Sequence, residues 1–133
     1  MRYLLDTNAC IRYLNGRSLP LAQKLLALPV TSVFVCSIVK AELFFGAAKS
    51  QMIEQKLARQ ISFLNQFVSL PFDDASAQIF GRIRAELARR GTPIGAYDLQ
   101  IAAIALVNNV TLVSHNTNEF ARVAGLMLED WET

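Results

Sequence analysis

Three carboxylates occupy unusual positions in this sequence. Asp6 directly follows the apolar run 3–5, Glu42 lies inside a helical segment, and Asp98 stands near the start of another apolar helical segment. Their neighbours on the same helical face are apolar: Ile38, Ala41 and Phe45 for Glu42, and Ile101, Ala102 and Ala105 for Asp98. An ionised acid on an inward face is costly unless something compensates its charge.

Each acid taken alone has a structural explanation. Asp6 can cap the helix that follows it, and Asp98 can interact favourably with the positive end of its own helix. Glu42 lies in mid-helix, where an ion pair with Lys40 or with an arginine is the structural alternative. Taken together, however, the three acids all follow expected strand ends or helix starts at one edge of the fold, which favours a shared site.

Carboxylates gathered at one place repel one another unless a cation lies among them. Oxygen ligands without cysteine or several histidines select Mg²⁺, or Mn²⁺ as a substitute, rather than zinc. Such an ion polarises a phosphate and lowers the pKa of a bound water. The chemistry that suits these acids is therefore hydrolysis of a phosphodiester.

No side chain is a convincing nucleophile. His115 is the only histidine, lies in an expected turn and has no obvious acid partner in the sequence, so no serine can be assigned to a serine–histidine–acid triad. Cys10 and Cys36 lie in apolar surroundings without CxxC spacing, which indicates two reduced core thiols.

The hydrophobic pattern predicts short strands that alternate with helices, which indicates an α/β fold with a mostly parallel sheet covered on both faces. Such sheets bind ligands outside the carboxyl ends of their strands. Ser37 is the expected N-cap of its helix, Asp73 or Asp74 caps another, and Gly91 ends it. We expect strands at 2–5, 33–36, 68–70 and 111–113, helices at about 8–14, 19–28, 37–48, 51–67, 74–90 and 96–108, and a closing segment with Leu126, Leu128 and Trp131.

Composition limits the classes of protein to consider. The chain has 133 residues, 53% of them hydrophobic and 18% charged, which fits one compact domain over 1–133. Its apolar stretches are too short for a membrane span or a secretory signal, so we expect a cytoplasmic protein. The net charge of +2 alone does not indicate nucleic acid binding, and the arginines at 82, 84, 89 and 90 fit a solvated helix face or a phosphate-binding patch.

The sequence strongly resembles PIN-domain ribonucleases, in particular the VapC toxins of bacterial toxin–antitoxin pairs. The resemblance covers nearly the whole chain and rests on several motifs in order. They are Leu4-Leu5-Asp6-Thr7-Asn8, Lys40-Ala41-Glu42-Leu43, the segment 93–102 around Asp98, the segment 112–120 with Asn116 and Glu119, and the closing residues 125–126 and 129–131.

The resemblance implies a PIN-like three-layer sandwich and a metal site. Asp6 and Asp98 would be the direct Mg²⁺ ligands, while Glu42 would complete the shell or orient the attacking water. Family members often have a fourth acid after the last strand, where this sequence has Asn116, with Glu119 nearby. Either residue could complete the site, although Asn116-x-x-Glu119 also has capping-box spacing. Thr7 and Asn8 would orient Asp6 or contact water.

The resemblance further implies an endoribonuclease that cuts tRNA or other translation-related RNA, is inhibited by a VapB-like antitoxin and forms a homodimer. The apolar residues Phe44, Phe45, Met52 and Ile53 could form a docking surface, although burial in the core is the favoured interpretation. An aspartyl phosphatase or receiver module is disfavoured because Asn8 stands where a second acid would be needed. The remaining alternative is a catalytically weak PIN-fold module that binds RNA or protein.

Overall fold

A five-stranded, entirely parallel sheet forms the centre of the computed structural model, which describes all residues from Met1 to Thr133. The strand order is β3-β2-β1-β4-β5, and in the register of the central strands Leu4 lies opposite both Phe34 and Leu112. The three central strands are short, apolar and mostly buried, as expected for a sheet with two covered faces, whereas the edge strands β3 and β5 are partly exposed. They are β1 (Tyr3–Leu5), β2 (Val33–Cys36), β3 (Val68–Leu70), β4 (Thr111–Val113) and β5 (Leu128–Glu129).

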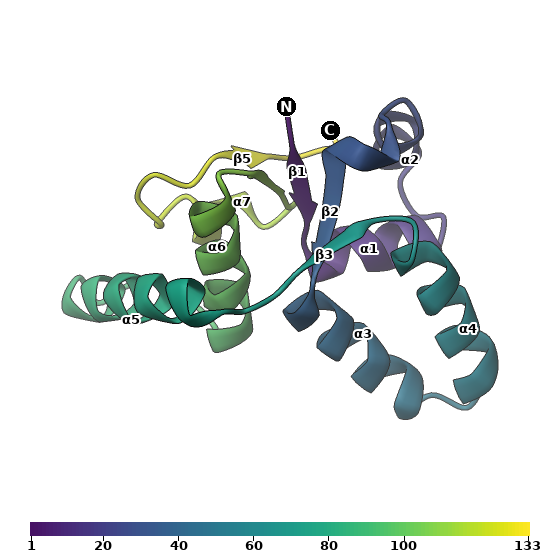
Figure 1. Ribbon diagram of the computed structural model, residues 1–133, viewed down its shortest axis with the longest axis horizontal. Coiled ribbons are helices and arrows are strands. Elements are labelled where there is room, and N and C mark those ends of the chain that lie inside the picture. Colours follow the sequence, from purple (N-terminus) through teal and green to yellow (C-terminus); the bar gives the residue numbers. More distant parts are fainter.

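Helices cover both faces of this sheet. Figure 1 shows β1 and β2 between two groups of helices, with α1, α2 and α4 to one side and α5, α6 and α7 to the other. The three-layer α/β prediction is therefore confirmed. The helices are α1 (Thr7–Leu14), α2 (Leu19–Leu26), α3 (Ser37–Ala48), α4 (Ile53–Leu64), α5 (Asp74–Arg89), α6 (Ala96–Asn108) and α7 (Thr117–Phe120), with a 3-10 turn at Val30–Ser32.

The strand order reverses between β1 and β4. The chain moves from β1 outward to β2 and β3, and then crosses back to β4 and β5 on the other side of β1. Right-handed crossovers running in opposite directions lie on opposite faces of a sheet, so the connections diverge at the carboxyl ends of β1 and β4. Such a switch point is where open α/β sheets form their ligand crevice. Asp6 and Ser114 directly follow these two strands.

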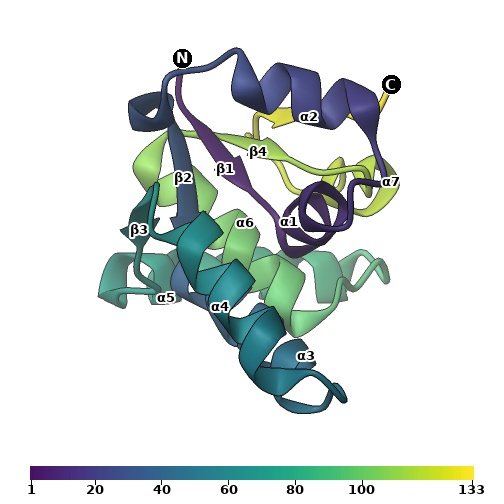
Figure 2. The ribbon, with the colours of Figure 1, turned by 90° about the vertical axis from the view of Figure 1, so that its right-hand side faces the viewer.

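One hydrophobic core joins the layers. The middle of α6 is completely buried from Ile101 to Ala105, which explains why this helix is apolar on all sides. Trp131 packs edge-on against Tyr3, with ring centroids 5.0 Å apart, and so closes the end of the sheet. Cys10 and Cys36 are free and buried, which confirms the prediction of two core thiols. Figure 2, which views the molecule from the right-hand side of Figure 1, shows α1 and α2 on the near side of β1 and β4. No helix is both long and apolar enough to cross a bilayer.

Several expected details are wrong. The N-cap of α3 is Cys36 rather than Ser37, whose hydroxyl instead accepts a hydrogen bond from the backbone N–H of Phe72. Helices α2 and α4 are shorter than predicted. The closing part of the chain contains one short helix, α7, where the sequence has capping-box spacing, and a fifth strand, β5, which was not expected. Elements of two to four residues are too short to show a hydrophobic period.

The exposure of α3 and α4 also contradicts the sequence interpretation. Phe45, Met52 and Ile53 are 65%, 54% and 47% exposed, so their assignment to the core is wrong, and only Phe44 packs against it. The buried stripe of α3 is Val39, Leu43 and Ala47, not the flank that Glu42 shares with Phe45. Glu42 is therefore not on the inward face, and its place in a site must be judged from its actual contacts.

Candidate active site

Asp6 lies at the switch point of the sheet and is only 3% exposed. Its backbone N–H donates to the carbonyl of Val113 at 3.1 Å, which fixes it beside the end of β4. Its Oδ1 accepts the backbone N–H of Ala9 at 2.8 Å and caps α1. The cap that the sequence suggests is thus present, and it holds the buried carboxylate rigidly.

Burial raises the pKa of Asp6 from 3.8 to about 6, because a charge is poorly solvated there. Hydrogen bonds from the Ser114 hydroxyl and the Ala9 N–H act in the opposite direction, while the charges of Asp98 and Glu132 raise the pKa further. The charge of Asp98 is thus close enough to Asp6 to interact with it. That the two carboxylates share a site stays a prediction.

Asp98 lies in the first turn of α6 and is half-buried. Burial raises its pKa, and the charges of Glu42 and Glu119 raise it further. Asp98 therefore connects the other acids electrostatically, since it interacts with Asp6 on one side and with Glu42 and Glu119 on the other. Its position at a helix start favours its negative charge but does not explain why three other acids surround it.

Thr7 joins the first helix to the third. Its hydroxyl donates to Oε1 of Glu42 at 2.6 Å, a charge-assisted hydrogen bond between α1 and α3. Thr7 thus contacts Glu42 rather than Asp6, while the alternative expectation that Thr7 or Asn8 contacts water stays a prediction. Asn8 is exposed and makes no side-chain hydrogen bond within the chain. Glu42 has no ion pair with Lys40 or with an arginine, so this structural alternative for Glu42 is wrong.

Asn116 and Glu119 contact each other at the start of α7. The Nδ2 of Asn116 donates to Oε2 of Glu119 at 3.0 Å, while the Asn116 side chain makes no capping bond to the backbone. The backbone N–H of Asn116 donates to the Ser114 hydroxyl at 2.9 Å, and Ser114 also binds Asp6. Of this pair Glu119 supplies the charge near Asp98, and Asn116 fixes the orientation of Glu119.

The four acids of this cluster, Asp6, Glu42, Asp98 and Glu119, have no basic partner. The chain contains only two ion pairs, Arg12–Glu132 and His115–Asp130, and both lie outside the cluster. Repelling carboxylates without a positive side chain are the arrangement that a divalent cation stabilises. The four acids do not bring three ligand atoms within 4.8 Å of one another; only His115, Asp130 and Glu132 do so. A Mg²⁺ ion held by one or two carboxylates and several waters does not need such a set.

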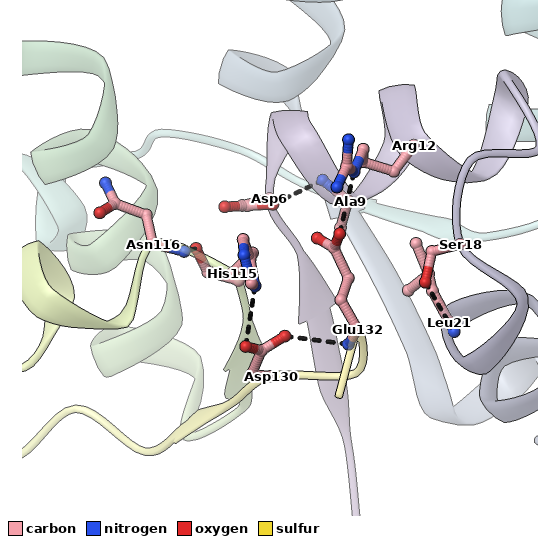
Figure 3. A network of polar contacts seen from close by, with 10 residues as sticks. Asp6, Ala9, Arg12, Ser18, Leu21, His115, Asn116, Asp130 and Glu132 are labelled. Carbon is pink, nitrogen blue, oxygen red and sulfur yellow. Dashed lines mark hydrogen bonds and ion pairs between the residues drawn. The ribbon is translucent and has the colours of Figure 1, made fainter.

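A second polar group beside Asp6 was missed by the sequence analysis. The Nδ1 of His115 lies 2.9 Å from Oδ2 of Asp130, so the expectation that His115 has no acid partner is wrong. Figure 3 shows this pair, with Arg12 and Glu132, next to Asp6. The hydroxyl of Ser114 bonds with Asp6 and Asn116 rather than with His115, which still excludes a serine–histidine–acid triad. Only the concentration of acids near residue 130 could have signalled this group.

The fold and the acids at its switch point correspond to a known class of proteins. The family model described as "PIN domain" matches residues 3–126. The chain therefore belongs to the PIN-domain family, whose nucleases generally use divalent metal ions.

Similar proteins place the chain more narrowly. It is 39% identical over 131 residues to a tRNA(fMet)-specific endonuclease VapC from Shigella flexneri, with 98% of each chain covered. The crystal structure of DNA-bound VapBC from Salmonella typhimurium has a TM-score of 0.92 at 37% identity and 98% coverage of both chains. VapBC2 from Rickettsia felis, bound to a promoter DNA fragment, has a TM-score of 0.91 at 36% identity, with 98% of this chain and 99% of that chain covered. The identification as a VapC-type ribonuclease toxin is confirmed.

Proposed function

We propose that residues 1–133 form a single PIN domain that hydrolyses RNA with a divalent metal held by Asp6, Glu42 and Asp98. The observation that carries this proposal is the cluster of mutually repelling acids at the switch point, which has no basic partner. Mg²⁺ is the proposed ion, with Mn²⁺ as a substitute, because the donors are hard oxygens. The ion would polarise the scissile phosphate and acidify a bound water.

The contacts of each acid support a distinct role. Asp6 is buried and capped by Ala9, so it offers a fixed anionic ligand. Asp98 is half-buried at the centre of the repulsive interactions, where it would be the second direct ligand. Glu42 is held by Thr7 and is suited to orient the attacking water. Glu119 would supply the fourth charge, with Asn116 holding its carboxylate in place.

The substrate we propose is tRNA or another structured RNA of the translation apparatus. The Shigella relative is named for its action on initiator tRNA, and it aligns with 98% of this chain. Sequence-specific enzymes of RNA mostly read unpaired loops, whose bases can leave the stack. A tRNA loop would bring an unpaired phosphodiester to the exposed side of the acid cluster. We further propose a cytoplasmic location, where such RNA is found.

The partner we propose is a VapB-type antitoxin, since the similar solved structures are VapBC assemblies. A surface suited to it lies between α1, α3 and α4. A cavity there is lined by three apolar residues, Ile11, Leu14 and Leu43, and by five others that include Lys56, Arg59 and Gln60, whose buried Oε1 has no hydrogen-bond partner. The exposed Phe45, Met52 and Ile53 lie on the same two helices, α3 and α4, or just before α4. We also propose that the chain forms a homodimer.

The alternative is a PIN-fold module that binds RNA or protein with little catalysis. It is disfavoured because the buried charge of Asp6 and the repulsion at Asp98 destabilise the fold. A protein that no longer catalysed a reaction would be expected to lose these features. Both features are retained in this chain.

The test is incubation of the purified protein with bulk tRNA, followed by mapping of the cut ends. We expect cleavage in Mg²⁺, none in EDTA, and a loss of at least about a hundredfold in Asp98→Asn. Glu54→Gln, which removes an exposed acid at the start of α4, is the matched control and should cut like the wild type. Cleavage by wild type in EDTA, or by Asp98→Asn at the wild-type rate, would contradict the proposal.

A further inference from the structure

A polar hollow of about 420 Å³ lies beside the acid cluster, between α1 and the segments that follow β4 and β5. Its volume is within the range of roughly 300 to 1,000 Å³ typical of small-ligand sites. Only one apolar side chain contributes to its wall, so it is not an anchor for an apolar peptide. The hollow is lined by Asn8, Ile11, Arg12, His115, Asn116 and Glu132.

This hollow adjoins the proposed active site. Asn116 lines the hollow and donates a hydrogen bond to Glu119 of the acid cluster, although none of the four acids lines the hollow itself. Glu132 is close enough to Asp6 for its charge to raise the pKa of that carboxyl. A phosphodiester bound at the acid cluster would therefore have an adjoining nucleotide next to the hollow.

The walls of the hollow are held in place by hydrogen bonds. The Nε of Arg12 donates to Glu132 at 2.9 Å, and Asp130 both contacts the His115 ring and accepts the backbone N–H of Glu132, each at 2.9 Å (Figure 3). Arg12 makes no hydrogen bond with its two terminal nitrogens. The wall is therefore fixed while part of the guanidinium stays free.

Two further groups on this wall are free for a ligand. The side chain of His115 is 58% exposed, which leaves an imidazole face open for stacking. Asn8 is exposed without a partner, so its amide can both donate and accept. An aromatic ring, an amide and a guanidinium are the groups with which proteins bind an unstacked base and its phosphate.

We propose that this hollow binds one nucleotide of the RNA substrate adjacent to the scissile phosphate. The base stacks on His115, Asn8 contacts its edge, and the free nitrogens of Arg12 contact a phosphate. The inference rests on the proposed RNA cleavage, and it adds the position at which sequence is read. A metal at His115, Asp130 and Glu132 is disfavoured, because Glu132 already pairs with the positive Arg12 and Asp130 with His115.

The test compares His115→Ala with His115→Phe, which keeps a stacking ring. Hairpin RNAs with varied loop sequences serve as substrates, and kcat, KM and cut position are measured. We expect His115→Ala to raise KM at least about tenfold and to weaken the base preference beside the cut, with kcat little changed, because one stacking contact is lost. His115→Phe should restore most of the affinity. Asn8→Ala should alter the preferred base.

Three controls separate this role from a structural one. Asn118→Ala removes an exposed amide on α7 that does not line the hollow, and it should cut like the wild type. Asp130→Asn tests whether a looser C-terminal segment alone reproduces the effect. Thermal unfolding of every variant reports on the fold. An unchanged KM and cut pattern in His115→Ala, or an equal loss in His115→Phe, would overturn the proposal.

A binding measurement keeps the subsite separate from catalysis. Fluorescein-labelled hairpin RNA is titrated into Asp98→Asn with and without His115→Ala, and fluorescence anisotropy gives Kd. Binding that His115→Ala weakens would support the subsite even if the wild type cuts no RNA, in which case only the proposed activity fails. Equal binding by both proteins would overturn the subsite while leaving cleavage intact. An absence of any RNA binding would overturn both.

Discussion

At the residue scale, Asp6 has two opposite effects on the stability of the fold. A buried aspartate is costly when ionised, yet this one also caps α1 and so stabilises the fold. The backbone bond to Val113 and the hydroxyl of Ser114 keep it at the end of the central strands. The residue is thus held in position for a metal at the expense of stability in metal-free protein.

The raised pKa of Asp6 predicts how stability depends on pH. Its folded pKa of about 6 exceeds the unfolded value of 3.8, so the folded state binds more protons between these values. In metal-free buffer the free energy of unfolding should therefore fall as pH rises from about 4 through 6, by roughly 3 kcal/mol from this group. Asp6→Asn keeps a capping side chain and should lack most of this loss, as measured by urea unfolding across that range. Parallel pH profiles for the two proteins would contradict the assignment.

At the element scale, the site depends on contacts between helices that the sequence places far apart. Thr7 at the start of α1 bonds Glu42 on α3, and Ser114 after β4 bonds Asp6 after β1. Elements of the site are therefore positioned by side-chain hydrogen bonds as well as by the sheet.

The Thr7–Glu42 bond leads to a prediction for catalysis. Thr7→Val removes the hydroxyl with little change in volume, so Glu42 should lose its fixed orientation. We expect kcat on tRNA to fall at least about tenfold with a smaller change in KM, because a hydrogen bond to a charged group contributes roughly 1.5–3 kcal/mol. Thr7→Ser retains the donor and should recover most of the activity. If Thr7→Val and Thr7→Ser behave alike, the bond has no role in turnover.

Some residues of the site could be predicted from the sequence, whereas most contacts between its elements could not. Asp6 and Asp98 were identifiable because each stands where a strand ends or a helix begins. Glu42 was assigned from a flank that proves to be exposed, so the motif resemblance was the sounder reason for choosing it. The pairing of His115 with Asp130 depends on β5, whose two residues give no period to detect. Contacts between residues that only the complete sheet brings together could not be inferred from local sequence patterns.

At the scale of the whole molecule, repulsion among the acids predicts that a bound cation stabilises the folded chain. Their repulsion acts only when the sheet brings Asp6, Asp98 and Glu119 together, and it is absent in the unfolded chain. An ion that binds only the folded protein therefore stabilises it through mass action.

Mg²⁺ should accordingly raise the melting temperature. At a concentration a hundredfold above Kd the expected gain is about 2.7 kcal/mol, which corresponds to a rise of about 8 °C or more for a domain of this size. Differential scanning calorimetry with and without EDTA measures this shift. Asp98→Asn should show less than half of it, whereas Glu54→Gln should show all of it. A similar rise in Asp98→Asn would place the ion elsewhere.

The order of the strands has a consequence for synthesis. Tyr3 pairs with Thr111, so the strand that leaves the ribosome early must wait for a neighbour that is made much later. Until β4 has been made, β1 can pair only with β2, and Asp6 lacks its interaction with Ser114. The nascent chain therefore cannot assemble the acid cluster until β4 and the residues after it have been synthesised.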